Sequence, residues 1–232
     1  MKNFNQINID FQDIEKEDFK PNVPTIYNIN WEGVQFNFLI NYVPNSKKAA
    51  IIGTGAIKKD YNIEELPFFS RSTYFLSIPY TCIYYFDSTI YMYDKLNLGW
   101  GYGVENRFIL ENIAYLLLTI LRKHNISFRN SLFFGNSGGG YQSILLATML
   151  RGKALAVNPQ LILKENYNAK PLSSVVNNLI ESRISCVEYF LRERYIPDLN
   201  IKINSTSKND ITKLSSFLEK IMEENIPFGQ NL

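Results

Sequence analysis

Short runs of hydrophobic residues recur along the chain and predict the strands of a sheet. The runs occupy residues 49–53, 81–87, 131–136, 154–158 and 201–205. They are nearly continuous in hydrophobic side chains, which is typical of strands buried on both faces of a parallel sheet. Upstream, residues 25–43 hold two β-rich runs around Glu32-Gly33, and these predict a hairpin.

Between the runs, hydrophobic residues recur every three or four positions and predict helices. These segments cover residues 104–123, the stretch after Ser137, residues 173–194 and residues 211–225. After Ser137, the small residues Gly139, Ser143 and Ala147 share one helix face, which would let that helix lie close to a sheet. The alternation predicts an α/β fold with a mostly parallel sheet, and functional groups at the carboxyl ends of its strands.

The length and composition predict one folded domain. The chain has 232 residues, of which 46% are hydrophobic and 14% aromatic, enough to form a sizeable core. Residues 1–22 are polar and predict an irregular lead-in, so the domain is expected to span residues 23–232. The net charge of +2 is small and no basic face stands out, which argues against nucleic-acid binding.

The same composition bears on location and cofactors. Residues 1–19 hold no hydrophobic leader, and the longest hydrophobic run, residues 113–121, is too short to span a bilayer. Cys82 and Cys186 are the only cysteines, and we expect both to be buried free thiols in a cytoplasmic protein. Because there is no Cys/His cluster, we expect no metal site, and nothing in the sequence calls for a cofactor.

Residues 133–142, FFGNSGGGYQ, carry the strongest chemical signal. Gly135-Asn136-Ser137-Gly138-Gly139 fits G-x-S-x-G, the turn that presents the nucleophile of serine hydrolases between a strand and a helix. A predicted strand precedes Ser137 and a predicted helix follows it, so Ser137 is the candidate nucleophile. The backbone N–H of Gly138 would then help to bind the oxyanion. A purely structural glycine-rich turn is the alternative.

A second oxyanion donor is expected from the loop after an earlier strand. Gly53-Thr54-Gly55-Ala56 follows the strand predicted at residues 49–53, so Gly55 and Ala56 are candidates. An ordinary turn is again the alternative. No Lys-Ser/Thr pair follows these glycines and no G-x-G-x-x-G opens a helix, which argues against a nucleotide-binding loop.

The other members of a catalytic triad are harder to find. Asp210 follows the last predicted strand and is the candidate acid, although it could equally cap the next helix. Asp198 precedes that strand and is a weaker choice. His124 is the only histidine, and it precedes the strand that leads to Ser137. Five strand residues at about 3.3 Å each would place it roughly 17 Å from the serine, too far for a general base.

The segment 84–103 is rich in aromatic residues. Its tyrosines and Trp100 could stack on sugar rings, but packing in the core and loops is the favoured interpretation. Trp100 stands between Gly99 and Gly101 in an expected loop, and is the best single candidate for a ligand contact.

Four stretches give a more specific resemblance. They are PFFSRSTYF (67–75), FDSTIYMYDKLNLGWGYG (86–103), FFGNSGGGYQSILLA (133–147) and ALAVNPQ (154–160). Over residues 45–225 the chain resembles α/β-hydrolase-like proteins of bacterial surface-polysaccharide loci and, more distantly, capsule O-acetyltransferases of that fold. The resemblance implies a three-layer sandwich with a serine-dependent esterase or O-acyltransferase site that acts on a glycan or a small acyl ester, with acyl-CoA as a candidate donor.

The resemblance also implies roles for individual residues. Ser137 would be the nucleophile and Asp210 the triad acid, with Gly55, Ala56 and Gly138 around the oxyanion. Asp87, Asn136 and Trp100 lie in the matching stretches and are taken as substrate-binding candidates.

One departure from the resemblance is important. In such proteins a last strand and a histidine follow the acid, but the given sequence ends at NIPFGQNL, before either. We therefore expect the fold to lack its usual last strand. Either the sequence is truncated, or a partner supplies the base, or the protein is a degraded hydrolase that binds a glycan or a protein. The open sheet edge would also favour homo-oligomers.

Overall fold

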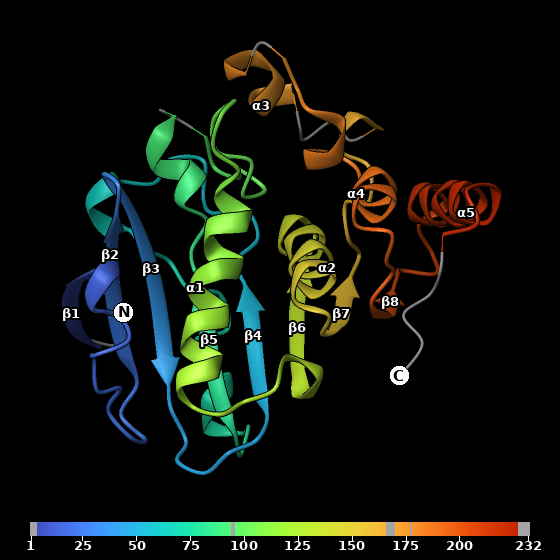
Figure 1. Ribbon diagram of the computed structural model, residues 1–232. Coiled ribbons are helices and arrows are strands. Elements are labelled where there is room, and N and C mark those ends of the chain that lie inside the picture. The colour runs from blue at the N-terminus through green and yellow to red at the C-terminus, as the bar shows by residue number, and fades with distance from the viewer. Residues whose placement is uncertain (1–3, 94–95, 166–169, 177, 227–232) are drawn as a thin grey trace.

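A mixed β-sheet forms the centre of the molecule (Figure 1). The computed structural model describes residues 4–93, 96–165, 170–176 and 178–226. Within them the sheet has eight strands in the order β1-β2-β3-β5-β4-β6-β7-β8. The strands are β1 (Asn5–Asp10), β2 (Thr25–Trp31), β3 (Val34–Asn41), β4 (Ala49–Gly53), β5 (Thr81–Tyr85), β6 (Ser131–Asn136), β7 (Lys153–Val157) and β8 (Asp198–Lys202).

The pairing confirms a mostly parallel sheet. Strands β5, β4, β6, β7 and β8 are parallel neighbours, whereas β3 is antiparallel to both β2 and β5. The expected hairpin is β2–β3, in which Trp31 pairs with Val34 across the turn. The parallel strands occur where the hydrophobic runs predicted them, although β8 begins three residues before its run.

The irregular lead-in predicted for residues 1–22 is wrong for residues 5–10. These residues form β1, which pairs in parallel with β2. Its hydrophobic residues Ile7 and Ile9 alternate with polar ones and pack against the main core, while the polar residues bond to β2. The Asn28 amide, for example, donates to Asn8 Oδ1 over 2.8 Å. The overall polarity of the segment hid this period of two.

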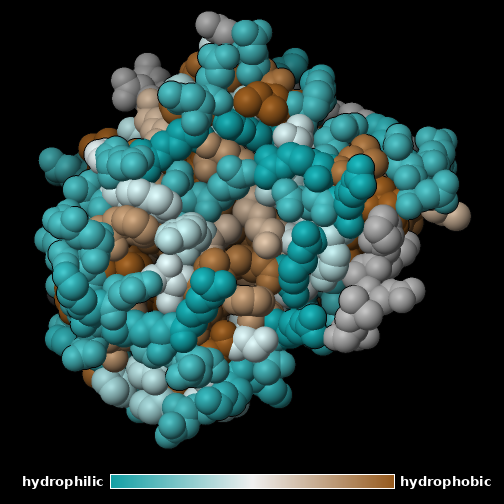
Figure 2. All heavy atoms as spheres, viewed as in Figure 1, coloured by the Kyte–Doolittle hydropathy of each residue, from teal (hydrophilic) through white to brown (hydrophobic). Residues whose placement is uncertain are grey.

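Four of the five described α-helices pack on one side of the sheet, and the short helix at residues 170–175 lies beyond the carboxyl ends of the parallel strands (Figure 1). The five helices are α1 (Ile109–Lys123), α2 (Gly138–Leu150), α3 (Lys170–Val175), α4 (Cys186–Glu193) and α5 (Lys208–Glu223), and each contributes to one core cluster. Helices α1 and α2 lie in front of the sheet in Figure 1, and α5 lies beyond β8. Polar side chains cover most of the surface on this side, as Figure 2 shows.

The opposite face of the sheet is covered by loops and 3-10 helices. Residues of this layer, such as Ile57, Phe69 and Ile90, form a second core with residues of β2–β6. The 3-10 helices of this layer are η2 (Ile63–Glu65), η3 (Tyr74–Leu76) and η4 (Ser88–Met92). Residues in or next to the other described 3-10 helices belong to the main core; these helices are η1 (Phe11–Asp13), η5 (Phe128–Asn130), η6 (Leu163–Glu165) and η8 (Glu181–Arg183). The fold therefore has the three layers expected of an α/β protein.

Helix α2 lies unusually close to the sheet. Nearly all of its side chains are buried, as expected for a helix that is hydrophobic or small on every side. A Cβ at Gly139 would lie 3.1 Å from the carbonyl oxygen of Gly53 in β4. This confirms that the small-residue face predicted from Gly139 allows a close approach.

The continuous helix predicted over residues 173–194 is wrong. The chain forms α3, η8 and α4 instead, and the hydroxyl of Ser185 caps α4 by accepting a hydrogen bond from the Glu188 N–H. Hydrophobic residues keep a helical spacing on both sides of Ser185, so the sequence pattern did not show that a new helix, α4, begins after this residue. Helix α5 likewise begins at Lys208, three residues before the predicted start, because Ser207 is its cap.

Two further sequence expectations concern membranes and thiols. None of the described helices is long and hydrophobic enough to cross a bilayer. Cys82 and Cys186 are both buried free thiols, as predicted. Burial raises the pKa of the Cys82 thiol to about 12, so it has little reactivity at neutral pH.

Candidate active site

Ser137 occupies a sharp turn between β6 and α2. Its backbone has φ 52° and ψ −123°, a conformation that residues other than glycine rarely adopt. The Ser137 N–H donates to the Val157 carbonyl over 2.9 Å, and the Ser137 carbonyl accepts from the Tyr141 N–H over 3.2 Å. These bonds to β7 and α2 hold the strained turn in place.

The glycines of the motif make this turn sterically feasible. A Cβ at Gly135 would lie 2.2 Å from the carbonyl oxygen of Gly139, far inside contact distance. A Cβ at Gly138 would lie 2.6 Å from the side chain of Leu98. Gly138 occupies a variable position of G-x-S-x-G, and the second glycine of the pattern is Gly139, where a Cβ would lie 3.1 Å from the carbonyl oxygen of Gly53. Gly135 and Gly139 therefore permit the close approach of β6, α2 and β4.

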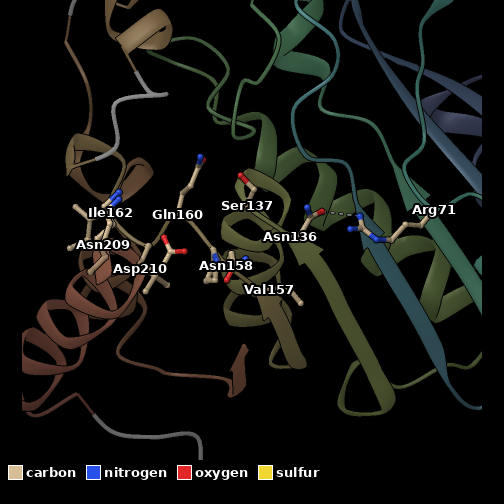
Figure 3. Close-up of a pocket in the computed structure, with 12 residues that line it drawn as sticks. Arg71, Asn136, Ser137, Val157, Asn158, Gln160, Ile162, Asn209 and Asp210 are labelled. Atoms are coloured by element: carbon tan, nitrogen blue, oxygen red, sulfur yellow. Dashed lines mark hydrogen bonds between the residues drawn. The ribbon is translucent and has the colours of Figure 1, made fainter. Parts of the chain in front are cut away.

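The Ser137 side chain faces a polar cavity of about 430 Å³ (Figure 3). It makes no capping hydrogen bond to α2 and is half-buried. The cavity is lined by the ends of β6 and β7, the segment after β7, the first turns of α5, and one arginine from the far side of the sheet. The lining residues are Arg71, Asn136, Ser137, Val157, Asn158, Pro159, Gln160, Leu161, Ile162, Asn209, Asp210 and Lys213.

Asp210 lies in this cavity, in the first turn of α5. The helix cap is Ser207, whose hydroxyl accepts a hydrogen bond of 3.3 Å from the Asp210 N–H. The suggestion that Asp210 itself caps the helix is therefore wrong. Its half-buried side chain lines the same cavity as Ser137, in front of the carboxyl end of β7 (Figure 3).

The loop after β4 packs against the turn at Ser137. Gly55 is buried, and a Cβ there would lie 3.4 Å from the carbonyl oxygen of Asn136. The Thr54 hydroxyl anchors the loop by donating to the carbonyl oxygens of Phe68 and Tyr85, each over 3.2 Å. Ala56 is exposed and lines another cavity of about 330 Å³, which is mainly apolar.

Arg71 is a site residue that the sequence did not reveal. One of its guanidinium nitrogens, Nη1, donates to Asn136 Oδ1 over 2.8 Å, and the guanidinium lies 5.5 Å from the centre of the Phe134 ring. Asn136 precedes Ser137, so Arg71 is fixed beside the nucleophile candidate (Figure 3). Sixty-five residues separate Arg71 from Asn136, and only the folded structure brings them together.

Asp87 is not available to a substrate, which corrects the sequence expectation. It is 1% exposed, and its carboxylate accepts hydrogen bonds from the backbone N–H groups of Thr89, Gly99 and Gly101 and from the Gln142 amide. Burial raises the pKa of Asp87, while these bonds oppose that shift. Asp87 therefore anchors the loop around Trp100 to α2.

Trp100 is also buried, at 1% exposure, so the ligand contact expected of it is wrong. Its indole N–H donates to the side-chain oxygen of Gln160, which lines the cavity. Trp100 thus supports a cavity residue from behind. Tyr84, Tyr85 and Tyr102 are buried as well, which confirms the interpretation of this segment as core packing.

His124 lies at the opposite edge of the sheet. It follows α1 and stacks on Tyr42, with ring centres 3.8 Å apart. Tyr42 directly follows Asn41, which pairs with Cys82 near the amino end of β5. Because Ser137 follows the carboxyl end of a strand parallel to β5, His124 cannot reach it.

In the part of the chain that the structure describes, no cluster of three or more His, Cys, Asp or Glu residues could hold a metal ion. The cavity around Ser137 contains a hydroxyl, a carboxylate, two cationic side chains and several amides. This set is suited to nucleophilic acyl transfer and to hydrogen bonding with a polar substrate.

Comparison with known proteins supports the fold. No family model matches the sequence, and no curated protein matches it. The capsule O-acetyltransferase of Neisseria meningitidis serogroup A is similar in structure, with a TM-score of 0.61 and 17% identity over 86% of this chain and 85% of that one. A mutant of that enzyme in complex with CoA is similar as well, with a TM-score of 0.60 and 18% identity over 88% of this chain and 87% of that one.

A putative carboxylesterase from Lactobacillus plantarum is also similar, with a TM-score of 0.57 and 10% identity over 88% of this chain and 84% of that one. At these identities the likeness establishes the fold alone. The chain has an α/β-hydrolase fold, with distant similarity to a capsule O-acetyltransferase. Among the described residues, β8 is the last strand of the sheet.

Proposed function

We propose that the protein is a serine-dependent esterase or O-acyltransferase with Ser137 as its nucleophile. The observation that carries the proposal is the placement of Ser137 at a strained strand-to-helix turn, with its side chain facing a polar cavity that also holds Asp210. A serine in this setting is exposed to substrate on one side and has backbone N–H donors nearby on the other.

In the proposed reaction, Ser137 Oγ attacks the carbonyl carbon of an acyl ester or thioester. The carbonyl oxygen becomes an oxyanion, which the Gly138 N–H and an N–H of the Gly55–Ala56 loop would stabilise, assisted by the dipole of α2. The bond to the leaving alcohol or thiol then breaks, and the serine proton passes to that group. Water or an acceptor hydroxyl next attacks the acyl-serine, the bond between the acyl group and Ser137 Oγ breaks, and the proton of the attacking group returns to Ser137 Oγ.

Asp210 is assigned the role of the acid that supports proton transfer. It is the carboxylate among the residues that line the described cavity. In the α/β-hydrolase arrangement the acid follows a strand after the nucleophile, and Asp210 lies after β8 in that order.

The proposed acyl acceptor or ester is a glycan, and acyl-CoA is the proposed donor. The amide side chains of Asn136, Asn158 and Gln160 can both donate to and accept from sugar hydroxyls. The structural likeness to a capsule O-acetyltransferase, one form of which binds CoA, supports the same choice. The formation of homo-oligomers through the edge strand β8 stays a prediction. The cytoplasmic location also stays a prediction.

A second candidate is a catalytically degraded hydrolase that binds a glycan or a protein. It is favoured by one observation: the chain's only histidine stacks on Tyr42, away from Ser137. This protein would retain the cavity but lack acyl turnover.

Labelling with a fluorophosphonate probe, read by intact mass, separates the two candidates. The enzyme proposal expects a single adduct on the wild type and none on Ser137→Ala. Matched esterase assays should show turnover lost in the same variant. A well-folded wild type that takes no adduct, or a Ser137→Ala protein that still turns over esters, would contradict the enzyme proposal. Saturable glycan binding without turnover would support the second candidate.

A further inference from the structure

The cavity at Ser137 has an excess of positive charge. Arg71 and Lys213 are its cationic side chains, and Asp210 is its carboxylate. None of the ion pairs among the described residues involves any of these three side chains. The cavity therefore has unpaired positive charge next to the nucleophile candidate.

The charges are divided between the two ends of the cavity. Asp210 and Lys213 are three positions apart on α5, so they lie on the same helix face, although no ion pair among the described residues joins their side chains. Arg71 lies at the other end, beyond Asn136 (Figure 3). The charge left without a nearby carboxylate is therefore that of Arg71.

The position of Arg71 is fixed by three features. Its backbone is left-handed with φ 57°, its guanidinium donates to Asn136 Oδ1, and its cationic group lies near the Phe134 ring. A guanidinium has five N–H donors arranged as a planar fork, and the bond to Asn136 uses one nitrogen. The remaining donors are suited to a planar or tetrahedral anion.

We propose that the substrate of Ser137 carries an anionic group, a carboxylate or a phosphate, that Arg71 binds. The inference rests on the proposed function and names its substrate class: an acylated or acceptor sugar with a negative charge near the reacting oxygen. Arg71 selects this substrate because a neutral sugar leaves its guanidinium unpaired in a half-buried cavity.

Three matched acetyl esters test the proposal. They are O-acetyl methyl glucoside, O-acetyl methyl glucuronoside and O-acetyl glucose 6-phosphate. We expect wild-type kcat/KM to be at least about tenfold higher for a charged ester than for the neutral one, the size of a hydrogen bond between charged groups. The better of the two charged esters identifies the anion as carboxylate or phosphate.

Three variants identify the residue responsible. Arg71→Gln should remove the preference for the charged ester. Arg71→Lys, which keeps the charge but loses the fork, should retain only part of it. Lys153→Gln is the control, because Lys153 is an exposed cation at the amino end of β7, the end opposite Val157 in the cavity. An equal preference in the wild type and Arg71→Gln would overturn the proposal, provided that circular dichroism shows both folded.

A binding experiment separates this inference from the proposed function. If the wild type hydrolyses none of the esters, the enzyme proposal fails, but glucuronate and glucose 6-phosphate can still be titrated into the protein by calorimetry. Binding of either anion, absent for glucose and weakened at least about tenfold in Arg71→Gln, would support the anion site alone. Equal binding of glucose, or no binding of either anion, would overturn it.

Discussion

The environment of His124 predicts that mild acid destabilises the protein. The His124 ring stacks on Tyr42 and packs edge-on against Phe19, with 5.1 Å between the ring centres of His124 and Phe19. Among the described atoms, its Nε2 is buried without a hydrogen-bond partner. Burial, with a smaller contribution from Lys123, lowers the pKa of His124 to about 4. The folded state therefore favours the neutral ring.

The sign and size of the effect follow from linkage. A depressed pKa stabilises the fold above the unfolded pKa of 6.5, and this contribution is lost as the pH falls from 6.5 towards 4. At pH 5 the unfolded chain binds a proton that the folded chain excludes, which would cost about 2 kcal/mol for a fully shielded ring. The His124 ring is only half-buried, so solvent screening reduces our expectation to about 1 kcal/mol.

Urea unfolding of the wild type and His124→Phe at pH 7.5 and pH 5.0 measures this contribution. Phenylalanine keeps the ring packing and needs no hydrogen-bond partner, so the variant should fold at both values. We expect the wild type to lose about 1 kcal/mol more than the variant between the two pH values. Because His124 is the only histidine, its proton signal can also be titrated by NMR without assignment. Equal losses, or an NMR pKa near 6.5, would refute the reasoning.

Two substitutions test the supports of the site. Asp87→Asn should cost about 2–4 kcal/mol in urea unfolding, because its amide group would place a donor against the N–H donors of residues 99–101; wild-type stability would contradict this. Gly135→Ala should prevent folding or abolish the labelling of Ser137 by the fluorophosphonate probe, because the added Cβ would clash with the Gly139 carbonyl oxygen. Gly33→Ala is the control, with no atom within 4 Å of the added Cβ, and should cost only about 1 kcal/mol for its positive φ.

The sequence predicted those parts of the fold that depend on local patterns. The hydrophobic runs located all five parallel strands from β4 to β8. The central strands β4 and β5 are buried throughout, whereas the edge strand β8 has no buried residue and was located only to within three residues. The G-x-S-x-G motif located the turn at Ser137, because only glycine fits at Gly135. Strand β1 was missed because its polar residues are satisfied by bonds to β2, 20 residues away, which no local pattern shows.

Site residues that depend on long-range contacts could not be predicted in the same way. Asp87 and Trp100 stand in a loop-like sequence and looked accessible, yet Asp87 gathers four hydrogen bonds inside the protein and Trp100 is covered behind Gln160. Arg71 stands in a sequence with no chemical motif, and acquires its interest only beside Asn136. Only tertiary packing decides whether a residue lines the cavity or lies buried behind a residue that does.

Backbone strain at Ser137 favours the proposed chemical role over an ordinary turn. Among the described residues other than glycine and asparagine, positive φ occurs at Glu32 in the β2–β3 turn and at Arg151 and Arg194, which end α2 and α4; the others are Arg71, Trp100 and Ser137. Arg71 and Ser137 line the cavity, and Trp100 bonds to its Gln160. Each such residue costs about 1–3 kcal/mol and persists only because its surroundings enforce the conformation. A turn that served packing alone would be more stable with glycine at position 137, so the strain at Ser137 favours a chemical role for its side chain.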